Sequence, residues 1–344
     1  MKKLLAWLLA LVLPAAVLAE EVGADASPIP ESTVPRFPAA YIRGVQKGGN
    51  FVFYVDQGGA IIHSYLGIDE DVIIPDKLAG YPVVSILNNA FSNQGLSGKS
   101  KLRSVAFPDT VTYIGPDAFR GCSKLEQLVF PPNSQLREID NSAFYDCPAL
   151  TDVQLPNHVE RIGHEAFGYC TSLTSFHIPA SVTQMEGNPF PCCKSLTSIT
   201  VAPENESFTV VNNMLIDKQP REIDRDDPNT AKTGSVRLLG YPCGLTETQV
   251  IIPEGVTEIC DKAFFWCESL KDVFLPESLL AIETSAFYGC TSLAHANLPA
   301  GIVHITGNPF SDNLGLRQVS FSVTVTPGSY GEDWAIRQAI PFSY

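Results

Sequence analysis

The sequence is poor in basic residues, and this scarcity limits the kinds of partner it can have. It holds 23 Lys and Arg against 37 Asp and Glu, with a formal net charge of −14 at pH 7. Nucleic acids and anionic lipid surfaces attract basic proteins, because Lys and Arg neutralise phosphates and release their counterions. The charge therefore argues against nucleic-acid and lipid-surface partners and is typical of a protein that stays soluble outside the cell.

Patterns that carry catalytic and metal chemistry are also missing. The chain has no Cys-x-x-Cys, His-Glu-x-x-His, Gly-x-Ser-x-Gly or phosphate-loop pattern. The sequence therefore predicts no zinc site, no metalloprotease site, no serine nucleophile at a sharp turn and no nucleotide-binding site. The acidic segment 224–229 carries Pro228 where a calcium loop needs a ligand, so we predict a solvated loop there. We expect no cofactor, no bound metal, no catalytic residue and no enzyme activity.

Only the amino terminus carries a long apolar run. Lys2 and Lys3 precede the apolar residues 4–13, and small residues lead up to Ala19. This order is typical of a secretory signal peptide, and the run is shorter than the ~20 residues that a membrane-spanning helix needs. We predict export and cleavage after residue 19. No Cys follows the run, so no lipid anchor is indicated, and we expect no membrane insertion after cleavage.

What the chain does have is the recurring phrase Ala-Phe-x-x-Cys. A variant with Pro in place of Ala stands at Pro189-Phe190. Successive marker phenylalanines are separated by 28, 25, 23, 23, 74, 23 and 23 residues. A period near 23 residues predicts a solenoid, in which one short unit stacks on copies of itself. The marker residues are Phe91, Phe119, Phe144, Phe167, Phe190, Phe264, Phe287 and Phe310.

Each repeat predicts one short strand and one segment that returns the chain. In the unit 159–179, Leu173, Phe176 and Ile178 follow the pattern L-x-x-Φ-x-Φ, where Φ is apolar. The alternating end of that pattern is typical of a strand with one buried face. Pro179 ends the strand because it has no N–H to donate. A single unit cannot bury its own apolar face, so only stacking completes the core.

The nine cysteines do not indicate a disulfide framework. Side chains stacked at one repeat position point in parallel, which suits the S–S torsion poorly even at the ~5 Å spacing of neighbouring strands. We predict instead a ladder of buried thiols, which pack as small apolar groups. One disulfide among Cys192, Cys243 and Cys260 remains open. The six cysteines that follow a marker Phe by three residues are Cys122, Cys147, Cys170, Cys193, Cys267 and Cys290.

Two similar passages divide the repeats into two blocks. Each begins with apolar segments typical of a β-hairpin and leads into Val-Ile-Ile-Pro, at 72–75 and at 250–253. Each block ends in Gly-Asn-Pro-Phe, and we expect the last strand at 316–321. The predicted organisation is a signal peptide 1–19, a flexible lead-in 20–45, a first hairpin and repeat block 46–202, a hairpin insert 203–249, a second repeat block 250–321 and a C-terminal cap 322–344.

The Ala-Phe-x-x-Cys phrase and the Pro-terminated strand resemble the bacterial BspA-type leucine-rich repeat, over about residues 75–321. The hairpin inserts and the phrase 325–330 are also similar to that family. The resemblance implies a leucine-rich-repeat solenoid, a right-handed curved superhelix with a parallel β-sheet on its concave face and β-hairpin inserts. It also implies an exported protein of the adhesion or surface-recognition kind. It implies no ligand, because one scaffold serves many partners.

The outward positions of the strands are the first candidate binding surface. Gln154, His177 and Phe274 at the third outward position, and His295 at the second, are the candidates for partner contact. The alternative is ordinary variation on a solvated sheet. The third outward position of successive strands holds Ala106, Val129, Gln154, His177, Thr200, Phe274, Asn297 and Ser320.

The second candidate surface lies between each marker Phe and its Cys, where aromatic residues gather. Partly exposed Tyr and Trp anchor protein partners and stack on sugar rings. The alternative is that these rings pack over the neighbouring repeat and protect the core. The residues are Tyr145, Tyr169, Phe265, Trp266 and Tyr288.

We interpret the chain as an exported, non-enzymatic recognition or adhesion protein, secreted or on the cell surface. Its expected partner is a macromolecule, such as a host-cell or matrix protein. The alternative is a glycan-binding module that uses the aromatic residues at the repeat bends. A third hypothesis, an enzyme site in the insert that uses Asp224 or Asp226, has no catalytic motif behind it.

Overall fold

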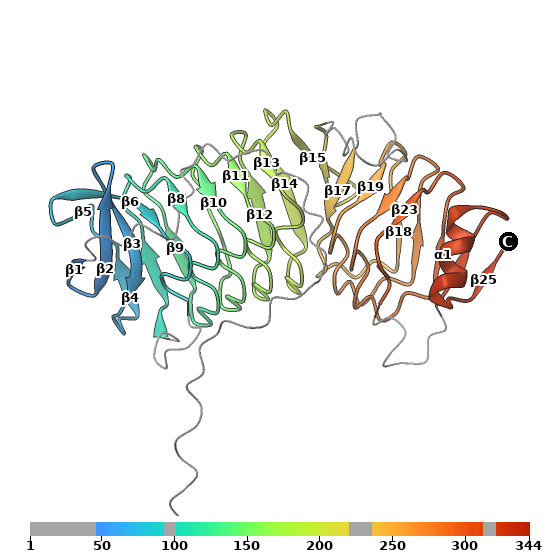
Figure 1. Cartoon of the computed structure of the whole chain (residues 1–344), viewed down its shortest axis with the longest axis horizontal. Helices are drawn as coiled ribbons and strands as arrows, with labels where there is room; N and C mark the ends of the chain where they lie inside the picture. The colour runs from blue at the N-terminus through green and yellow to red at the C-terminus, as the bar shows by residue number, and fades with distance from the viewer. Residues whose placement is uncertain (1–45, 93–100, 220–235, 312–320) are drawn as a thin grey trace, which may run out of the picture. The chain divides into compact units, whose positions relative to one another are not determined.

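The repeats build two kinds of parallel strand, one from the L-x-x-Φ-x-Φ segment of each turn and one from the segment that returns the chain. The computed structural model describes residues 46–92, 101–219, 236–311 and 321–344 (Figure 1). These residues all fall in one unit of the chain, 37–344. The signal peptide, the lead-in 20–45 and the acidic segment 224–229 lie outside the described residues.

The first kind of strand forms what we call the front sheet, which comes in three hydrogen-bonded groups. It keeps the predicted repeat register: Ser104 lies opposite Gln127, and His177 opposite Thr200. The groups are β4 (Asp71–Ile73), β7 (Ser104–Ala106) and β9 (Gln127–Val129); β12 (Ser175–Ile178) and β14 (Ser198–Val201); and β18 (Gln249–Ile251), β20 (Asp272–Phe274), β22 (His295–Asn297), β24 (Ser322–Thr324) and β25 (Phe342–Ser343).

One repeat departs from the predicted continuous sheet. Residues 151–154 form no strand, and this interrupts the front sheet between β9 and β12. Val153 is nevertheless buried in the core. Apolar stacking therefore holds this repeat in place without a strand ladder.

The second kind of strand forms the back sheet, in which most strands have two residues and place Ile or Met in the core; β6 and β17, at the hairpins, are longer. Ile139 lies opposite Ile162, and both are fully buried. The strands of the first block are β6 (Tyr81–Ile86), β8 (Tyr113–Ile114), β10 (Glu138–Ile139), β11 (Arg161–Ile162) and β13 (Gln184–Met185), and those of the second are β17 (Arg237–Gly240), β19 (Glu258–Ile259), β21 (Ala281–Ile282) and β23 (His304–Ile305).

The first predicted hairpin is present as β2 and β3, and the second, 214–216 with 236–239, as the antiparallel strands β16 and β17; each joins the back sheet. The structure adds a hairpin that was not predicted, because the turn Asn212-Asn213 joins β15 to β16. This turn and Gln57-Gly58 have positive φ at both residues, which suits tight two-residue hairpin loops. β3 pairs in parallel with β6, and β17 with β19. The remaining strands are β1 (Gln46–Gly48), β2 (Phe51–Asp56), β3 (Gly59–Tyr65), β5 (Lys77–Leu78), β15 (Phe208–Val211) and β16 (Met214–Asp217).

The insert hairpin also packs against the cores of both blocks. The buried apolar side chains form two clusters, and Leu215 belongs to the first while its neighbour Ile216 belongs to the second. Successive side chains of a strand point to opposite faces. One strand, β16, therefore contributes apolar side chains to both blocks.

The marker phenylalanines form a continuous stack within each block. Phe119 and Phe144 are 5.1 Å apart between ring centroids and 9° from parallel, and Phe264 and Phe287 are 4.9 Å apart at the same angle. The sequence interpretation missed two members. Tyr65 stacks on Phe91 at 5.1 Å and Tyr241 on Phe264 at 5.2 Å, so each hairpin supplies a tyrosine at the marker position.

The predicted thiol ladder is confirmed. None of the nine cysteines, all of which lie in the described residues, is in a disulfide, and the six repeat-locked ones are buried. The thiol of Cys170 donates to the carbonyl oxygen of Phe144 at 3.3 Å, and that of Cys290 to Phe264 at 3.1 Å. Burial raises the pKa of Cys170 to about 12. Cys192, Cys243 and Cys260 are free thiols in the structure as well.

The end of the second block differs from the prediction. Residues 312–320, which include the predicted outward residues Arg317, Gln318 and Ser320, lie outside the described residues, but the last repeat strand is β24, in register with β22. The strand that follows β22 is therefore β24; the strand expected at 316–321 lies outside the described residues except for Phe321, which is in no strand. Phe321 stacks on Phe310 at 4.6 Å, and the buried residue that continues the alternation is Val323. The helix α1 (Tyr330–Gln338) then closes this end, with Trp334 packed against Phe310.

Candidate functional site

The structure brings the sheet-face candidates together only in part. His177 is exposed and its Nδ1 lies 2.9 Å from Thr200 Oγ1 on the next strand. His295 is half-buried, with Nε2 2.8 Å from Thr324 Oγ1. Gln154, on the repeat without a strand, is exposed and donates to Asp152. These polar residues bond to their neighbours and form no pocket with one another.

Phe274 has a different setting, because its ring is exposed beside another apolar side chain. It is 43% exposed and lies directly opposite Ile251, which is 66% exposed, on the adjacent strand β18. The sequence interpretation did not include Ile251. A signal existed: in Val250-Ile251-Ile252 the alternation of a strand turns the middle residue outward.

The aromatic residues of the bends are packed rather than freely displayed. Tyr145 lies 5.0 Å from Tyr169, which approaches Phe265 at 6.3 Å. Phe265 in turn stacks on Tyr288 at 5.1 Å. Phe265 is only 7% exposed, so the interpretation of this residue as a surface contact is wrong. Its ring is covered because it lies where the two blocks meet.

Two of these aromatic residues have backbone conformations that glycine usually takes. Tyr169 and Trp266 have φ of 60° and 61°, and the same repeat position holds Gly121 and Gly289 elsewhere. An L-residue in the left-handed region costs roughly 1 kcal/mol. The packing of the rings must offset this cost.

The faces of the outer rings are already occupied. The Arg120 guanidinium lies 4.3 Å from the centre of the Tyr145 ring, and Lys194 Nζ lies 4.7 Å from that of Trp266. A Cβ at Gly289 would come within 2.8 Å of the Trp266 indole, which shows how closely the next repeat covers it. A sugar ring would have to displace these contacts before it could stack.

Ion pairs hold the two blocks together at this junction. Lys262 pairs with Glu165, and Lys194 pairs with Glu268 at 2.7 Å. His164 Nε2 lies 3.5 Å from Asp261 Oδ2. Burial by itself would raise the pKa of Glu165, but hydrogen bonds with His164 and Lys262 outweigh it and lower that pKa to about 2. Burial raises the pKa of Asp261.

The back sheet of the first block carries one arginine among several carboxylates. Arg161 pairs with Glu138, reaches Glu186 at 2.6 Å and lies 3.3 Å from Asp140. Burial raises the pKa of Glu138, although Arg161 opposes the rise. Paired charges of this kind lose most of their hydration, and this cost offsets much of the attraction between them.

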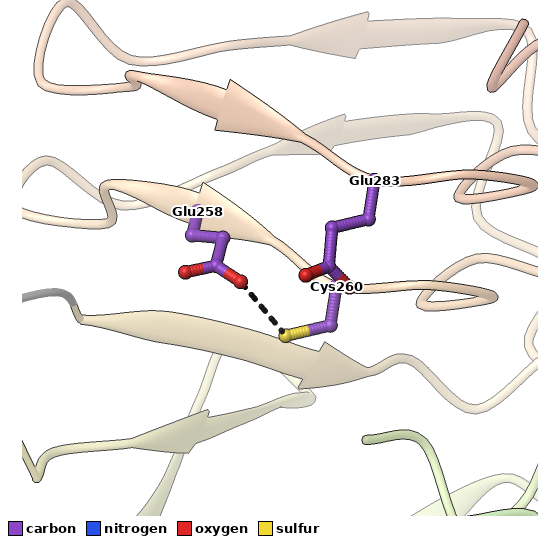
Figure 2. A group of neighbouring side chains, drawn as sticks. All are labelled: Glu258, Cys260 and Glu283. Carbon is purple, nitrogen blue, oxygen red and sulfur yellow. Dashed lines mark hydrogen bonds between the residues drawn. The ribbon is translucent and has the colours of Figure 1, made fainter. Parts of the chain in front are cut away.

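The corresponding residues of the second block are the only cluster of possible metal ligands in the described residues. Cys260 faces Glu258, with 3.9 Å between Sγ and Oε1, and Glu283 approaches from the next strand (Figure 2). Arg237, however, donates to the Cys260 sulfur from Nε and Nη2, both at 3.3 Å. The guanidinium also lies 3.7 Å from Glu258 and 3.8 Å from Asp217, so it places a positive charge inside this cluster.

These features define a leucine-rich-repeat solenoid. Residues 84–214 and 241–330 match the BspA type leucine rich repeat region, with six copies. The chain therefore belongs to this family. No curated protein matches the chain.

Several solved bacterial structures share the fold. The pneumococcal vaccine antigen PcpA is 20% identical, with a TM-score of 0.59, and the match covers 82% of this chain and 81% of that one. A leucine-rich repeat protein from Eubacterium ventriosum is 19% identical, with a TM-score of 0.51, over 75% of this chain and 66% of that one. A leucine rich cell surface protein from Faecalibacterium prausnitzii is 25% identical, with a TM-score of 0.43, over 81% and 88%. In the part of the chain that the structure describes, no helix has the length and apolar character to cross a bilayer.

Proposed function

We propose that this chain is an exported, non-enzymatic recognition protein that binds a protein partner through the outward side of the front sheet. The observation that carries the proposal is the exposed pair Ile251 and Phe274 on adjacent strands. Buried aromatic and aliphatic anchors supply most of the binding energy of protein interfaces. An exposed apolar pair on a solvent-facing sheet is a suitable anchor point.

The proposal of export rests on the predicted signal peptide. Export in turn leads us to expect a secreted or cell-surface protein. A host-cell or matrix protein remains the kind of partner we propose. Adhesion would follow if the partner were fixed to a surface. The absence of a catalytic motif from the sequence favours recognition over an enzymatic role.

The proposal can be tested with a library of random peptides displayed on phage. The mature protein, residues 20–344, is used for selection, and each selected peptide is titrated against the wild type and against Ile251→Ser with Phe274→Ser. We expect peptides that lose affinity for the double variant by about tenfold or more. The matched control is Ile336→Ser, an equally exposed aliphatic on α1.

The proposal is wrong if no peptides are selected, or if all of them bind the wild type and the double variant equally. Unchanged circular dichroism and thermal melting of the variants must show that the fold is intact. The proposal is supported only by peptides whose affinity falls with the double variant and is unchanged with the control variant.

A second candidate is glycan binding through the bend aromatics, because Tyr145, Tyr169, Trp266 and Tyr288 retain partial exposure. Polysaccharides that stack on Trp266 should quench its fluorescence, and Trp266→Phe should abolish that signal. Absence of quenching across a polysaccharide panel removes this candidate. The occupied ring faces make it the weaker of the two.

A further inference from the structure

The two blocks share an exposed isoleucine that the core does not need. In the phrase Val-Ile-Ile-Pro, the first and third apolar residues are buried in both blocks, as Val72 and Ile74 show. The middle residue points outward: Ile73 is 78% exposed and Ile251 66%. Because these side chains add nothing to the core, a polar residue would serve the fold equally well there.

Each of these isoleucines begins a short apolar patch on the front sheet. In the first block, Ile73 lies beside Ala106, which lies beside Val129 on the third strand, and Val129 is 48% exposed. In the second block the patch consists of Ile251 and Phe274. Between the two patches the same column is polar.

The charges around the two patches differ. Beside the first, Glu70 and Asp71 are exposed, and Asp71 accepts a hydrogen bond of 2.6 Å from Ser104. The nearby Arg103 is engaged, because its guanidinium pairs with Glu126 at 2.9 Å. The first patch therefore has an excess of negative charge, in a chain whose net charge is −14.

The charges around the second patch are balanced. Asp272 lies on the same strand as Phe274, and Lys271 directly precedes that strand. Gln249 donates to the Asp272 carboxylate at 3.0 Å. One positive and one negative side chain thus flank the apolar pair. A partner gains no advantage from charge of either sign at this patch.

We propose that the first patch, made by Ile73, Ala106 and Val129, is a second docking site that binds an aliphatic side chain flanked by Lys or Arg on a protein partner. This inference rests on the proposed function and specifies its partner. The aliphatic side chain is buried against Ile73 and Val129, while the basic side chain pairs with Glu70 or Asp71. The second patch binds an apolar side chain without selecting a charge.

The test uses the same peptide library with the full mature chain and four variants: Ile73→Ser, Glu70→Gln with Asp71→Asn, Ile251→Ser, and the control Ile336→Ser. We expect a class of peptides, rich in Lys or Arg, whose affinity falls about tenfold with Ile73→Ser and is unchanged with Ile251→Ser. Their binding should weaken as salt rises, and the charge variant should remove most of that salt dependence.

The outcomes separate this inference from the proposed function. Peptides that depend on Phe274, with none that depend on Ile73, overturn the second site and leave the proposed function standing. Peptides that depend on Ile73 without any excess of Lys or Arg overturn the partner chemistry. If no peptide depends on either patch, both proposals fail.

Discussion

Lys194 and Glu268, which are 74 residues apart in the sequence, form an ion pair of 2.7 Å where the two repeat blocks meet. The same ammonium lies over the Trp266 ring. Lys262 and Glu165, 97 residues apart, make a second pair across the junction. The second block therefore stacks on the first, although the insert 203–249 lies between the two blocks in the sequence.

The thiol ladder predicts a specific labelling pattern. Alkylation of the denatured protein without a reductant should modify all nine cysteines, because none is in a disulfide. In the native protein, Cys243 should react first, because it is only half-buried. Burial raises the pKa of both Cys170 and Cys243 to about 12, so exposure and not the thiolate fraction sets this order. Intact-mass spectrometry checks the count; a denatured mass that lacks two or more alkyl groups would contradict it.

The phenylalanine stack predicts a large difference between buried and exposed aromatic residues. Phe167→Ala removes a fully buried ring that stacks on Phe144, so the free energy of unfolding should fall by about 3–5 kcal/mol. The control is Phe274→Ala on the exposed sheet face, which should change it by less than about 0.5 kcal/mol. Urea unfolding followed by circular dichroism measures both; equal effects would contradict the inward placement.

Trp266 gives a prediction about backbone strain. Its φ of 61° lies in the left-handed region, where glycine has no steric cost. Both Trp266→Ala and Trp266→Gly lose the contact with Lys194, but only alanine keeps the strain. The glycine variant should therefore be more stable than the alanine variant by about 1 kcal/mol. The usual order, with alanine more stable, would show that this residue is not in the left-handed region.

Glu165 predicts an acid-dependent weakening of the block junction. Its pKa is lowered from 4.5 to about 2 through hydrogen bonds with His164 and Lys262. Because the folded-state pKa is the lower one, the stabilisation is complete above the unfolded pKa and is lost as pH falls from about 4.5 towards 2. Its upper limit is roughly 3 kcal/mol.

The measurement compares wild type with Glu165→Gln in urea unfolding at several pH values. The difference in unfolding free energy should be constant near neutral pH and shrink below about pH 4.5. The difference format cancels the titration of groups far from Glu165. Asp261, whose pKa burial raises, also contacts Lys262 at 3.5 Å and therefore contributes to the difference. Glu160→Gln, at an exposed pair with Arg137, is the control and should show little effect at any pH. A difference that grows with acid would refute the assignment.

Much of the fold could be predicted from the sequence because the residue pattern within each repeat is sufficient to predict the structure of that repeat. The alternation of Leu173, Phe176 and Ile178 and the fixed place of the Cys depend only on residue type and spacing. Both were confirmed, and all three apolar side chains and the repeat-locked thiols are buried. Repeats that contact only their neighbours leave their pattern in the sequence in this way.

The candidate site was harder to predict, since exposure depends on what covers a residue. Phe265 looks like Trp266 in the sequence, but Tyr169 and Tyr288 cover it. Ile73 looks like part of a buried apolar run, but its side chain points away from the core. Phe321 looks like the final residue of the strand expected at 316–321, but it is in no strand and stacks on Phe310.

The sequence by itself determined the repeat length, the inward and outward faces of most strands and the family. Those features depend on residues close together in the sequence, and the same pattern occurs in each repeat. Only the tertiary structure decided that Tyr65 and Tyr241 extend the phenylalanine stack, that ion pairs join the two blocks, and that Ile73 and Ile251 are exposed in matching places. These features depend on which side chains lie above and below each repeat, and the neighbours that decide them are distant in the chain.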